Sequence, residues 1–120
     1  MTMHLTTETL LRLLADDIRL RCVSLLCSED GLSLTELTHV LRLPQAKLHR
    51  HLSCLQLVNV ITRYEIGYVT HFRMTPDLPA WAKEMLYAIT LSIAQTNPFI
   101  GDRIALSQLP NRCWPDVRYA

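Results

Sequence analysis

Long apolar runs are absent from this chain of 120 residues. No stretch approaches the length of a membrane span, and the start, MTMHLTTETLLRLLADDIRLR, lacks the features of a signal peptide. The chain also lacks internal repeats and low-complexity segments. We therefore expect one folded cytoplasmic domain without a membrane partner, with its four cysteines reduced.

Motifs for enzymatic chemistry are missing too. The sequence has no phosphate-binding loop, no paired carboxylates suited to a cleft and no nucleophile–base motif. A catalytic Cys–His pair has no fixed sequence spacing, because its two residues meet only in the folded protein, so the sequence does not exclude this one arrangement. We predict that the protein is not an enzyme.

The formal net charge of +1 says nothing about nucleic acid, but the charge is unevenly distributed. Residues 38–76 hold five basic side chains and a single acid, Glu65, so this segment is +4 and the remainder is −3. Four of the five histidines lie there as well. Such a block is typical of phosphate binding, and a solvated surface of uneven charge is the alternative.

Helical periodicity begins near the N-terminus. The segment TLLRLLADD has a wide leucine face and predicts a first helix. A second helix is expected in DDIRLRCVSLLCSEDG, capped by Asp16 or Asp17 and ended by Gly31.

Two further helices lie so close together that they predict a helix-turn-helix. In LSLTELTHVLRL, Ser33 and Glu36 have the spacing of a capping box. Pro44 suits the first position of the next helix, which runs to about Leu57. Only LRL joins the two helices.

The pattern then changes from helix to strand. The segment NVITRYEIGYVTHFRMTP, with Gly67 near its middle, predicts a β-hairpin. Helices are expected in 77–96 and 99–109, followed by a loose tail. We predict a mainly α fold with a small β-hairpin, a winged helix-turn-helix, with a domain at 1–108 and a C-terminal tail at 109–120.

The stretch LPQAKLHRHLSCLQLV concentrates polar groups at its start and leucines on one face. In a winged helix-turn-helix the N-terminal part of this helix enters the DNA major groove. Its polar groups would then meet bases and phosphates while its leucines pack on the domain. Two alternatives are an ordinary amphipathic helix and a winged helix that binds only proteins.

Three motifs resemble the ArsR/SmtB family of bacterial winged-helix repressors. LLADDIRLRCVSLL is similar to the family's LADxTRLxIVxLL, and LPQAKLHRHLSCL to SQPKxSRHLxxL. YEIGYVTHFRMTPDLPAWA resembles the wing and the RLxPxxPAWA junction of the arsenic-responsive branch. The resemblance covers about residues 10–81 without a gap.

The resemblance implies a homodimer that binds an inverted-repeat operator in double-stranded DNA and leaves it when an inducer binds. The helix after Pro79 and the first helix would form the dimer interface, although the stripe of Trp81, Met85 and Ile89 can equally be core. His51 matches a family histidine that can be a satisfied, partly buried group. The positions that would face DNA are Gln45, Lys47, His49 and Arg50 in the second helix of the motif. In the wing, Arg63, Tyr68 and His71 are candidates for contacts to the DNA backbone or minor groove, and plain exposed strand residues are the alternative for each of them.

Two metal sites of this family are absent from the sequence. The arsenic-responsive cluster CVCxxC is replaced by SLTELT, and hydroxyl groups are poor ligands for soft ions. The zinc site of the last helix needs histidine, and residues 77–95 contain none.

The cysteines suggest a different sensor. Cys54 lies in HLSCL, which is similar to the cadmium- and lead-sensing branch, and Cys113 of the tail can complete a site between subunits. Cys22 and Cys27 are possible helpers, with a core role favoured for Cys22. The inducer would be As(III), Sb(III), Cd(II) or Pb(II), with no cofactor certain. One alternative is that the cysteines sense oxidants or sulfide through thiol oxidation. The other alternative is that the cysteines are purely structural.

Overall fold

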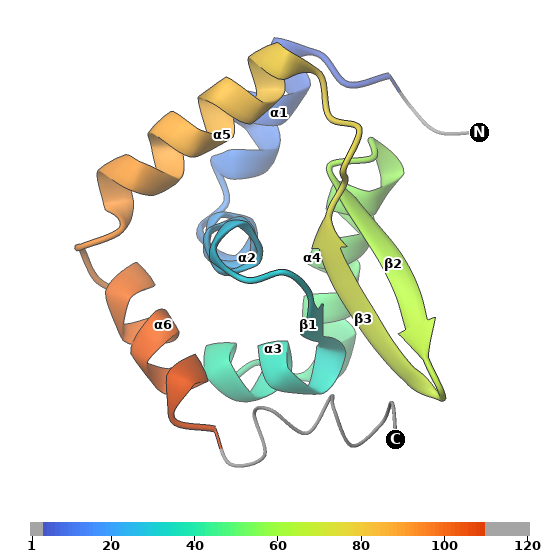
Figure 1. Ribbon diagram of the computed structural model, residues 1–120, viewed down its shortest axis with the longest axis vertical. Coiled ribbons are helices and arrows are strands. Elements are labelled where there is room, and N and C mark those ends of the chain that lie inside the picture. Colours follow the sequence, from blue (N-terminus) through green and yellow to red (C-terminus); the bar gives the residue numbers. More distant parts are fainter. Residues whose placement is uncertain (1–3, 110–120) are drawn as a thin grey trace.

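The computed structural model describes residues 4–109, which form six helices and a small sheet (Figure 1). Figure 1 shows the second helix end-on, ringed by the other elements. In chain order the elements are α1 (Thr7–Leu14), α2 (Asp17–Ser28), β1 (Leu32–Ser33), α3 (Leu34–Leu41), α4 (Gln45–Leu57), β2 (Ile61–Ile66), β3 (Val69–Met74), α5 (Ala80–Ile93) and α6 (Phe99–Ser107).

Local capping sets the start of α2 and α3. The Asp16 carboxylate accepts hydrogen bonds from the backbone N–H groups of Ile18 and Arg19. The Ser33 hydroxyl accepts from the Glu36 N–H at 3.0 Å, and the Glu36 carboxylate accepts from the Ser33 N–H at 2.8 Å. Both caps satisfy N–H groups that a helix start leaves unpaired, and both predictions are confirmed.

The sheet has three antiparallel strands in the order β1-β3-β2. A two-residue loop joins β2 to β3, and Gly67 takes a positive φ of 61° at its first central position, as such tight loops require. The predicted hairpin is confirmed, and the structure adds a third strand to it. The third strand, β1, is only two residues long, too short for a sequence pattern to register.

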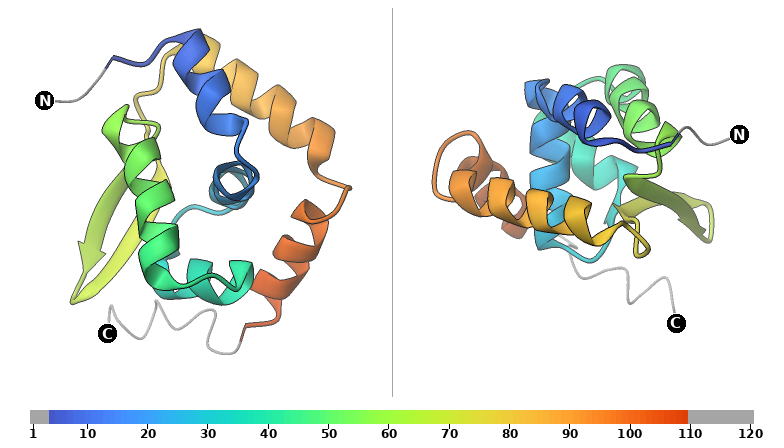
Figure 2. Two further views of the ribbon diagram at one scale, coloured as in Figure 1. Left: turned by 180° about the vertical axis from the view of Figure 1, so that it is seen from behind. Right: turned by 90° about the horizontal axis from the view of Figure 1, so that it is seen from above.

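The core fills the space between α2 and the surrounding elements. Figure 2 shows from behind and from above that α1 and α4 cover one side of α2, with α5 and α6 on the other. Apolar side chains from all six helices and the sheet meet there, including Leu10, Leu25, Leu48, Phe72, Leu86 and Leu106. Because α2 contacts α4 as well as α5 and α6, it connects the helix-turn-helix to the two C-terminal helices.

Two boundary predictions need small corrections. Pro44 is the N-cap of α4 with extended backbone, and the first helical residue is Gln45. Helix α2 ends at Ser28, three residues before Gly31. Gly31 has a φ of +105°, and a Cβ there would lie 2.2 Å from the Tyr64 hydroxyl oxygen, so a glycine is needed at this approach.

Within residues 4–109, no helix has the length and apolar character required to cross a membrane. The prediction of a domain boundary at residue 108 stays a prediction.

Candidate nucleic-acid interface

The turn between α3 and α4 places the start of α4 at the surface. Arg42 ends α3 in the left-handed conformation, with φ 56° and ψ 47°, and the chain turns back through Leu43 and Pro44. No side chain caps the first turn of α4. Its backbone N–H groups and the positive end of the helix dipole are therefore available to an anion such as a phosphate.

Helix α4 presents two distinct faces. The leucines of its stripe are 0% exposed and hold the helix against the domain: Leu48, Leu52 and Leu55. All four predicted DNA contacts of the helix are exposed near its N-terminus: Gln45, Lys47, His49 and Arg50. The polar front and apolar back of the sequence thus correspond to the two faces of one helix.

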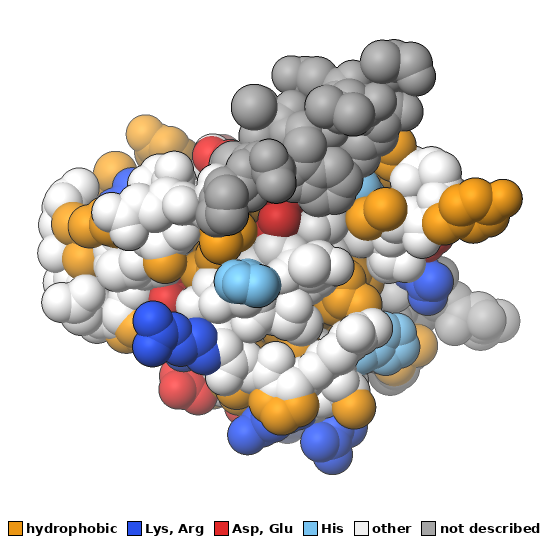
Figure 3. Space-filling view, turned by 90° about the horizontal axis from the view of Figure 1, so that it is seen from below, with side chains coloured by type: hydrophobic (Ala, Val, Ile, Leu, Met, Phe, Trp, Pro, Cys, Tyr) orange, Lys and Arg blue, Asp and Glu red, His pale blue; other side chains and the backbone are white. Residues whose placement is uncertain are grey.

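The wing, defined as β2, β3 and their loop, projects beside α4 (Figure 1). Tyr68 at its tip is fully exposed, and Arg63 is exposed on β2. Arg63 Nε donates to the Glu65 carboxylate at 3.2 Å, an exposed pair that a phosphate can displace at little cost. Figure 3 views α3, the start of α4 and the wing from below, where basic and histidine side chains lie across the face.

The burial of His71 contradicts the prediction that this residue contacts DNA. Its side chain is only 2% exposed, with Nδ1 3.1 Å from the Val69 carbonyl oxygen. Its ring lies 5.4 Å from that of Tyr64, centre to centre. β3 is the central strand of the sheet, and His71 pairs with Ser33 of β1 on one side and with Tyr64 of β2 on the other. The buried Nε2 of His71 has no hydrogen-bond partner within residues 4–109.

His51 ties α4 to the junction of α1 and α2. Its Nδ1 lies 3.3 Å from the Arg19 guanidinium and 3.8 Å from the Asp16 carboxylate. A guanidinium only donates, so when this hydrogen bond forms the His51 ring carries its proton on Nε2. Arg19 also donates from Nε to the Leu13 carbonyl at 2.8 Å. Helix α4 is thus held by a polar contact as well as by leucines, as the interpretation of His51 as a satisfied group expects.

Asp16 is the acid of this cluster. Burial alone would raise its pKa, but the Arg19 and Ile18 backbone N–H groups, the charge of Arg19 and, when its ring is protonated, the charge of His51 outweigh that effect. The net result is a lowered pKa, so the carboxylate stays ionised and caps α2 at neutral pH.

The described cysteines occupy three different environments. Cys22 is 0% exposed in the core, which agrees with its favoured structural role, and burial raises the pKa of its thiol to about 12. Cys27 is exposed at the end of α2 and lines a neighbouring cavity, and partial burial of its thiol raises the pKa to about 11. Cys54 is half-buried on α4, and Cys113 lies outside the described residues. No group of three or more His, Cys, Asp and Glu side chains in residues 4–109 is placed to hold a metal ion.

Comparison with known proteins shows to which family the chain belongs. The chain is 35% identical over 85 residues to the arsenic resistance transcriptional regulator ArsR1 of Pseudomonas putida, covering 71% of this chain and 66% of the relative. It is 32% identical over 82 residues to ArsR2 of the same organism, covering 68% of this chain and 71% of that relative. The chain belongs to the ArsR/SmtB family of transcriptional regulators. This is not a family of enzymes, and the chain spans just under two thirds of the length of ArsR1.

Solved structures agree on the fold of this ArsR/SmtB-family chain. HlyU from Vibrio cholerae N16961 matches with a TM-score of 0.64 at 23% identity, covering 72% of this chain and 90% of that one. The transcriptional repressor PagR of Bacillus anthracis matches with a TM-score of 0.56 at 22% identity, covering 67% and 87%. No family model matches the chain. The winged helix-turn-helix prediction is confirmed.

Two exposed arginines near the candidate interface were not among the predicted contacts. Arg42 is exposed in the turn of the motif, and Arg73 is exposed on β3 with its guanidinium carbon 5.3 Å from the centre of the Tyr64 ring. Both belong to the basic block of 38–76, and that charge count was the signal that included them.

Proposed function

We propose that this ArsR/SmtB-family chain is a DNA-binding transcriptional repressor that binds an inverted-repeat operator as a homodimer. The observation that carries the proposal is the division of α4 into an exposed polar N-terminal part and a stripe of fully buried leucines. Gln45 can pair with adenine through two hydrogen bonds, and Arg50 or Lys47 with guanine or phosphate. Arg63 and Tyr68 of the wing would contact the DNA backbone or minor groove.

The dimer would form through α1 and α5, as the family resemblance implies. Leu11 on α1 is 51% exposed and Leu91 on α5 is 63% exposed, and both are apolar side chains that a partner can cover. Trp81, Met85 and Ile89 are half-buried and pack against the core of their own chain, so they would contribute at most their remaining surface.

DNA binding is tested by fluorescence anisotropy with a labelled duplex from the gene's own promoter, titrated at several salt concentrations. A repressor that neutralises several phosphates loses affinity steeply and log-linearly with salt. A random duplex of equal length should bind more weakly. A chain that serves only protein interactions would show neither salt-dependent binding nor a preference for the promoter.

For the inducer, the proposal is a thiophilic ion, As(III), Sb(III), Cd(II) or Pb(II), bound by Cys54 and Cys113 across the dimer. The names of ArsR1 and ArsR2 as arsenic resistance regulators support this class of inducer. Thiolates are the ligands that soft ions prefer, and Cys54 lies on the helix that would read DNA. Binding there would pull α4 away from its DNA-competent position.

The inducer test adds each ion to the reduced protein–DNA complex. Release is expected with at least one ion, and Cys54→Ser and Cys113→Ser should each abolish it. Cys27→Ser tests the possible helper: a site made of Cys54 and Cys113 alone should still release DNA, whereas a site that includes Cys27 should not. Release by peroxide or sulfide, with no response to any of the four ions, would replace this proposal by a thiol-redox or sulfide-responsive repressor.

A further inference from the structure

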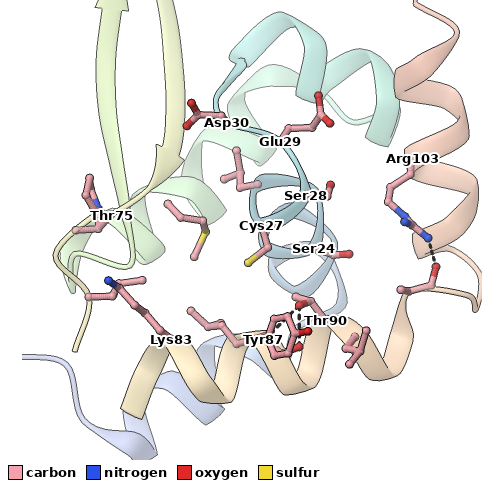
Figure 4. Close-up of a pocket in the computed structure, with 17 residues that line it drawn as sticks. Ser24, Cys27, Ser28, Glu29, Asp30, Thr75, Lys83, Tyr87, Thr90 and Arg103 are labelled. Carbon is pink, nitrogen blue, oxygen red and sulfur yellow. Dashed lines mark hydrogen bonds between the residues drawn. The ribbon is translucent and has the colours of Figure 1, made fainter. Parts of the chain in front are cut away.

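A cavity of about 740 Å³ opens between α2, the end of β3, α5 and α6. Its volume lies within the range of roughly 300–1,000 Å³ that is usual for binding sites. Figure 4 shows side chains from all four elements around this space. The residues predicted to contact DNA all lie within the described part of the chain, and none of them lines the cavity. The proposed DNA contacts therefore leave this hollow without a role.

The wall of the cavity is mainly apolar. Leu26 of α2, Met74 of β3 and Leu78, which lies between β3 and α5, supply part of it. Tyr87 of α5 lines it as well, and 70% of this residue is exposed. Apolar surface that is open to water favours an apolar occupant, because removing both surfaces from water stabilises the contact.

Three polar groups near the end of α2 are hydrogen-bond acceptors at the cavity. Glu29 and Asp30 line it, and Figure 4 shows them at the edge opposite α5. The Ser28 hydroxyl donates to a backbone carbonyl oxygen of α2 at 2.9 Å, so it can only accept further hydrogen bonds. The cations of the lining, Lys83 and Arg103, come from α5 and α6 instead. An occupant that reaches the α2 edge should therefore bring donors and positive charge.

The chain itself continues toward this edge. Helix α6 runs from the end of α5 toward α3, against which it packs, so the chain leaves the described residues on the side of the cavity where the acids lie (Figures 1 and 4). It continues as PNRCWPDVRYA, residues 110–120, which include two arginines and two aromatic residues.

The length of this segment is sufficient to return to the cavity. Leu109 lies about 9 Å along the helix direction beyond Arg103, which lines the cavity. From Leu109, an extended backbone carries the chain up to roughly 17 Å by Trp114. The tryptophan can therefore reach the cavity after the arginine that precedes it has passed the acidic edge.

From this arrangement we infer that residues 110–120 of the same chain dock in this cavity. The Trp114 indole lies against the apolar wall, and Arg112 lies beside the acids Glu29 and Asp30. An indole is large and apolar, buries about 150–250 Å², and carries an N–H that only donates, which suits an apolar wall with acceptors at one edge. The guanidinium and the carboxylates form charge-assisted hydrogen bonds that direct the segment to this edge.

Docking also decides where Cys113 lies. Between Arg112 and Trp114, it is held at the cavity, which Cys27 of α2 lines. The proposed inducer site needs Cys113 at Cys54 on α4, across the dimer. An inducing ion therefore has to draw the segment out of the cavity before both thiolates can bind it. This regulatory part rests on the proposed function, whereas the docking does not.

The first test measures the access of solvent to Trp114 in the full chain. Trp81→Phe keeps an aromatic ring and removes the other tryptophan, so that fluorescence reports Trp114 alone. Acrylamide should quench the native chain severalfold less than the chain unfolded in urea, and Glu29→Gln with Asp30→Asn should increase the quenching. Glu84→Gln, which changes an exposed acid of α5 outside the cavity lining, is the matched control and should leave quenching unchanged.

The labelling rate of Cys27 locates the docked segment. A ring in the cavity shields this thiol, so Trp114→Ala should make iodoacetamide label Cys27 severalfold faster. Trp114→Phe keeps an aromatic ring and should keep most of the protection. Cys54, which lies on α4 outside the cavity lining, is the internal control and should be labelled at the same rate in every variant. Both substitutions lie in the segment, so neither alters a side chain of residues 4–109.

Three results would overturn the inference. Trp114 quenching equal to that of the unfolded chain would show that the indole is not docked. Cys27 labelling that Trp114→Ala leaves unchanged would place the segment elsewhere. Protection that is lost on dilution, as sedimentation velocity shows the dimer dissociating, would assign the cavity to a second copy of the chain.

Release of DNA by the inducer separates this inference from the proposed function. In the anisotropy assay, Trp114→Ala should release promoter DNA at a severalfold lower ion concentration, because no docked segment has to be displaced. An unchanged concentration would remove the regulatory step and leave the docking. Failure of the wild type to bind its promoter would remove the proposed function, and the quenching and labelling results would still decide the docking.

Discussion

Arg21 and Asp102 form a two-point ion pair that joins α2 to α6. Arg21 Nε donates to Asp102 Oδ2 at 2.8 Å, and Nη2 donates to Oδ1 at 2.7 Å. The Asp102 side chain is 6% exposed, and its hydrogen bonds raise the pKa of the Arg21 guanidinium. The pair holds the last described helix against the centre of the domain, next to the cavity.

Replacing one partner should therefore be costly. Asp102→Asn is expected to lower the free energy of unfolding by about 2–3 kcal/mol, because it leaves a largely buried guanidinium with a weaker partner. Glu8→Gln breaks the exposed pair with Arg12 on α1 and should cost no more than about 0.5 kcal/mol. Urea unfolding of both variants gives the comparison, and equal losses would mean that the Arg21 pair contributes no more than a surface pair.

Two glutamines at opposite ends of α4 test where DNA is read. Gln45→Ala should weaken promoter binding by about tenfold and relax selectivity, since a two-point contact to adenine supplies about 1–3 kcal/mol of discrimination. Gln56→Ala changes the same side chain at the other, exposed end of the helix and should leave affinity unchanged. Anisotropy with the promoter and a random duplex measures both. Equal effects of the two variants would contradict the placement of the helix.

Gly31 and Tyr64 test the approach of the α2–β1 loop to the sheet. Gly31→Ala should destabilise the fold by about 1–3 kcal/mol, because φ is +105° and the new Cβ meets the Tyr64 hydroxyl. Adding Tyr64→Phe should relieve the contact but not the backbone strain. Thermal unfolding of the two single variants and the double variant checks this. If the loss of stability in the double variant equals the sum of the two single losses, the contact between the new Cβ and the Tyr64 hydroxyl is excluded.

Asp16 predicts a pH dependence of stability. Its pKa in the folded protein lies below the ordinary value of 3.8, so its contribution is complete above 3.8 and is lost as pH falls through the folded pKa. Asp16→Ala should cost about 1 kcal/mol at neutral pH through loss of the cap. Asp16→Asn keeps the cap without the charge, so its stability difference from the wild type should shrink below pH 3.8. Urea unfolding across acidic pH measures this, and a constant difference would contradict it.

The thiols should differ sharply in reactivity. The pKa values of about 12 for Cys22 and about 11 for Cys27 keep both protonated at neutral pH, and the thiolate is the reactive form. Iodoacetamide should leave Cys22 unmodified until the protein unfolds. It should label Cys27 slowly, and faster as pH rises toward 11. Mass spectrometry of timed samples follows each site, and native labelling of Cys22 at its denatured rate would show that the core opens.

Features that depend on neighbours along the chain could be predicted from the sequence. The capping box of Ser33 and Glu36 and the leucine stripe of α4 follow from spacings of three and four residues, which a helix brings together wherever it lies. The glycine in the wing loop and the basic block are similarly local. These features were sufficient for the winged helix-turn-helix and for the exposed polar residues of α4.

Features that join distant parts of the chain needed the tertiary structure. The two-residue strand β1 exists only because β3 lies beside it. The burial of His71, for which the sequence predicted a DNA contact, likewise depends on what packs around β3. The Arg21–Asp102 pair spans 81 residues and has no sequence signature. The cavity between α2, α5 and α6 likewise depends on how these helices pack. Local spacing determined which helices form and which faces they have, whereas the burial of polar groups was decided by contacts between segments that no sequence pattern links.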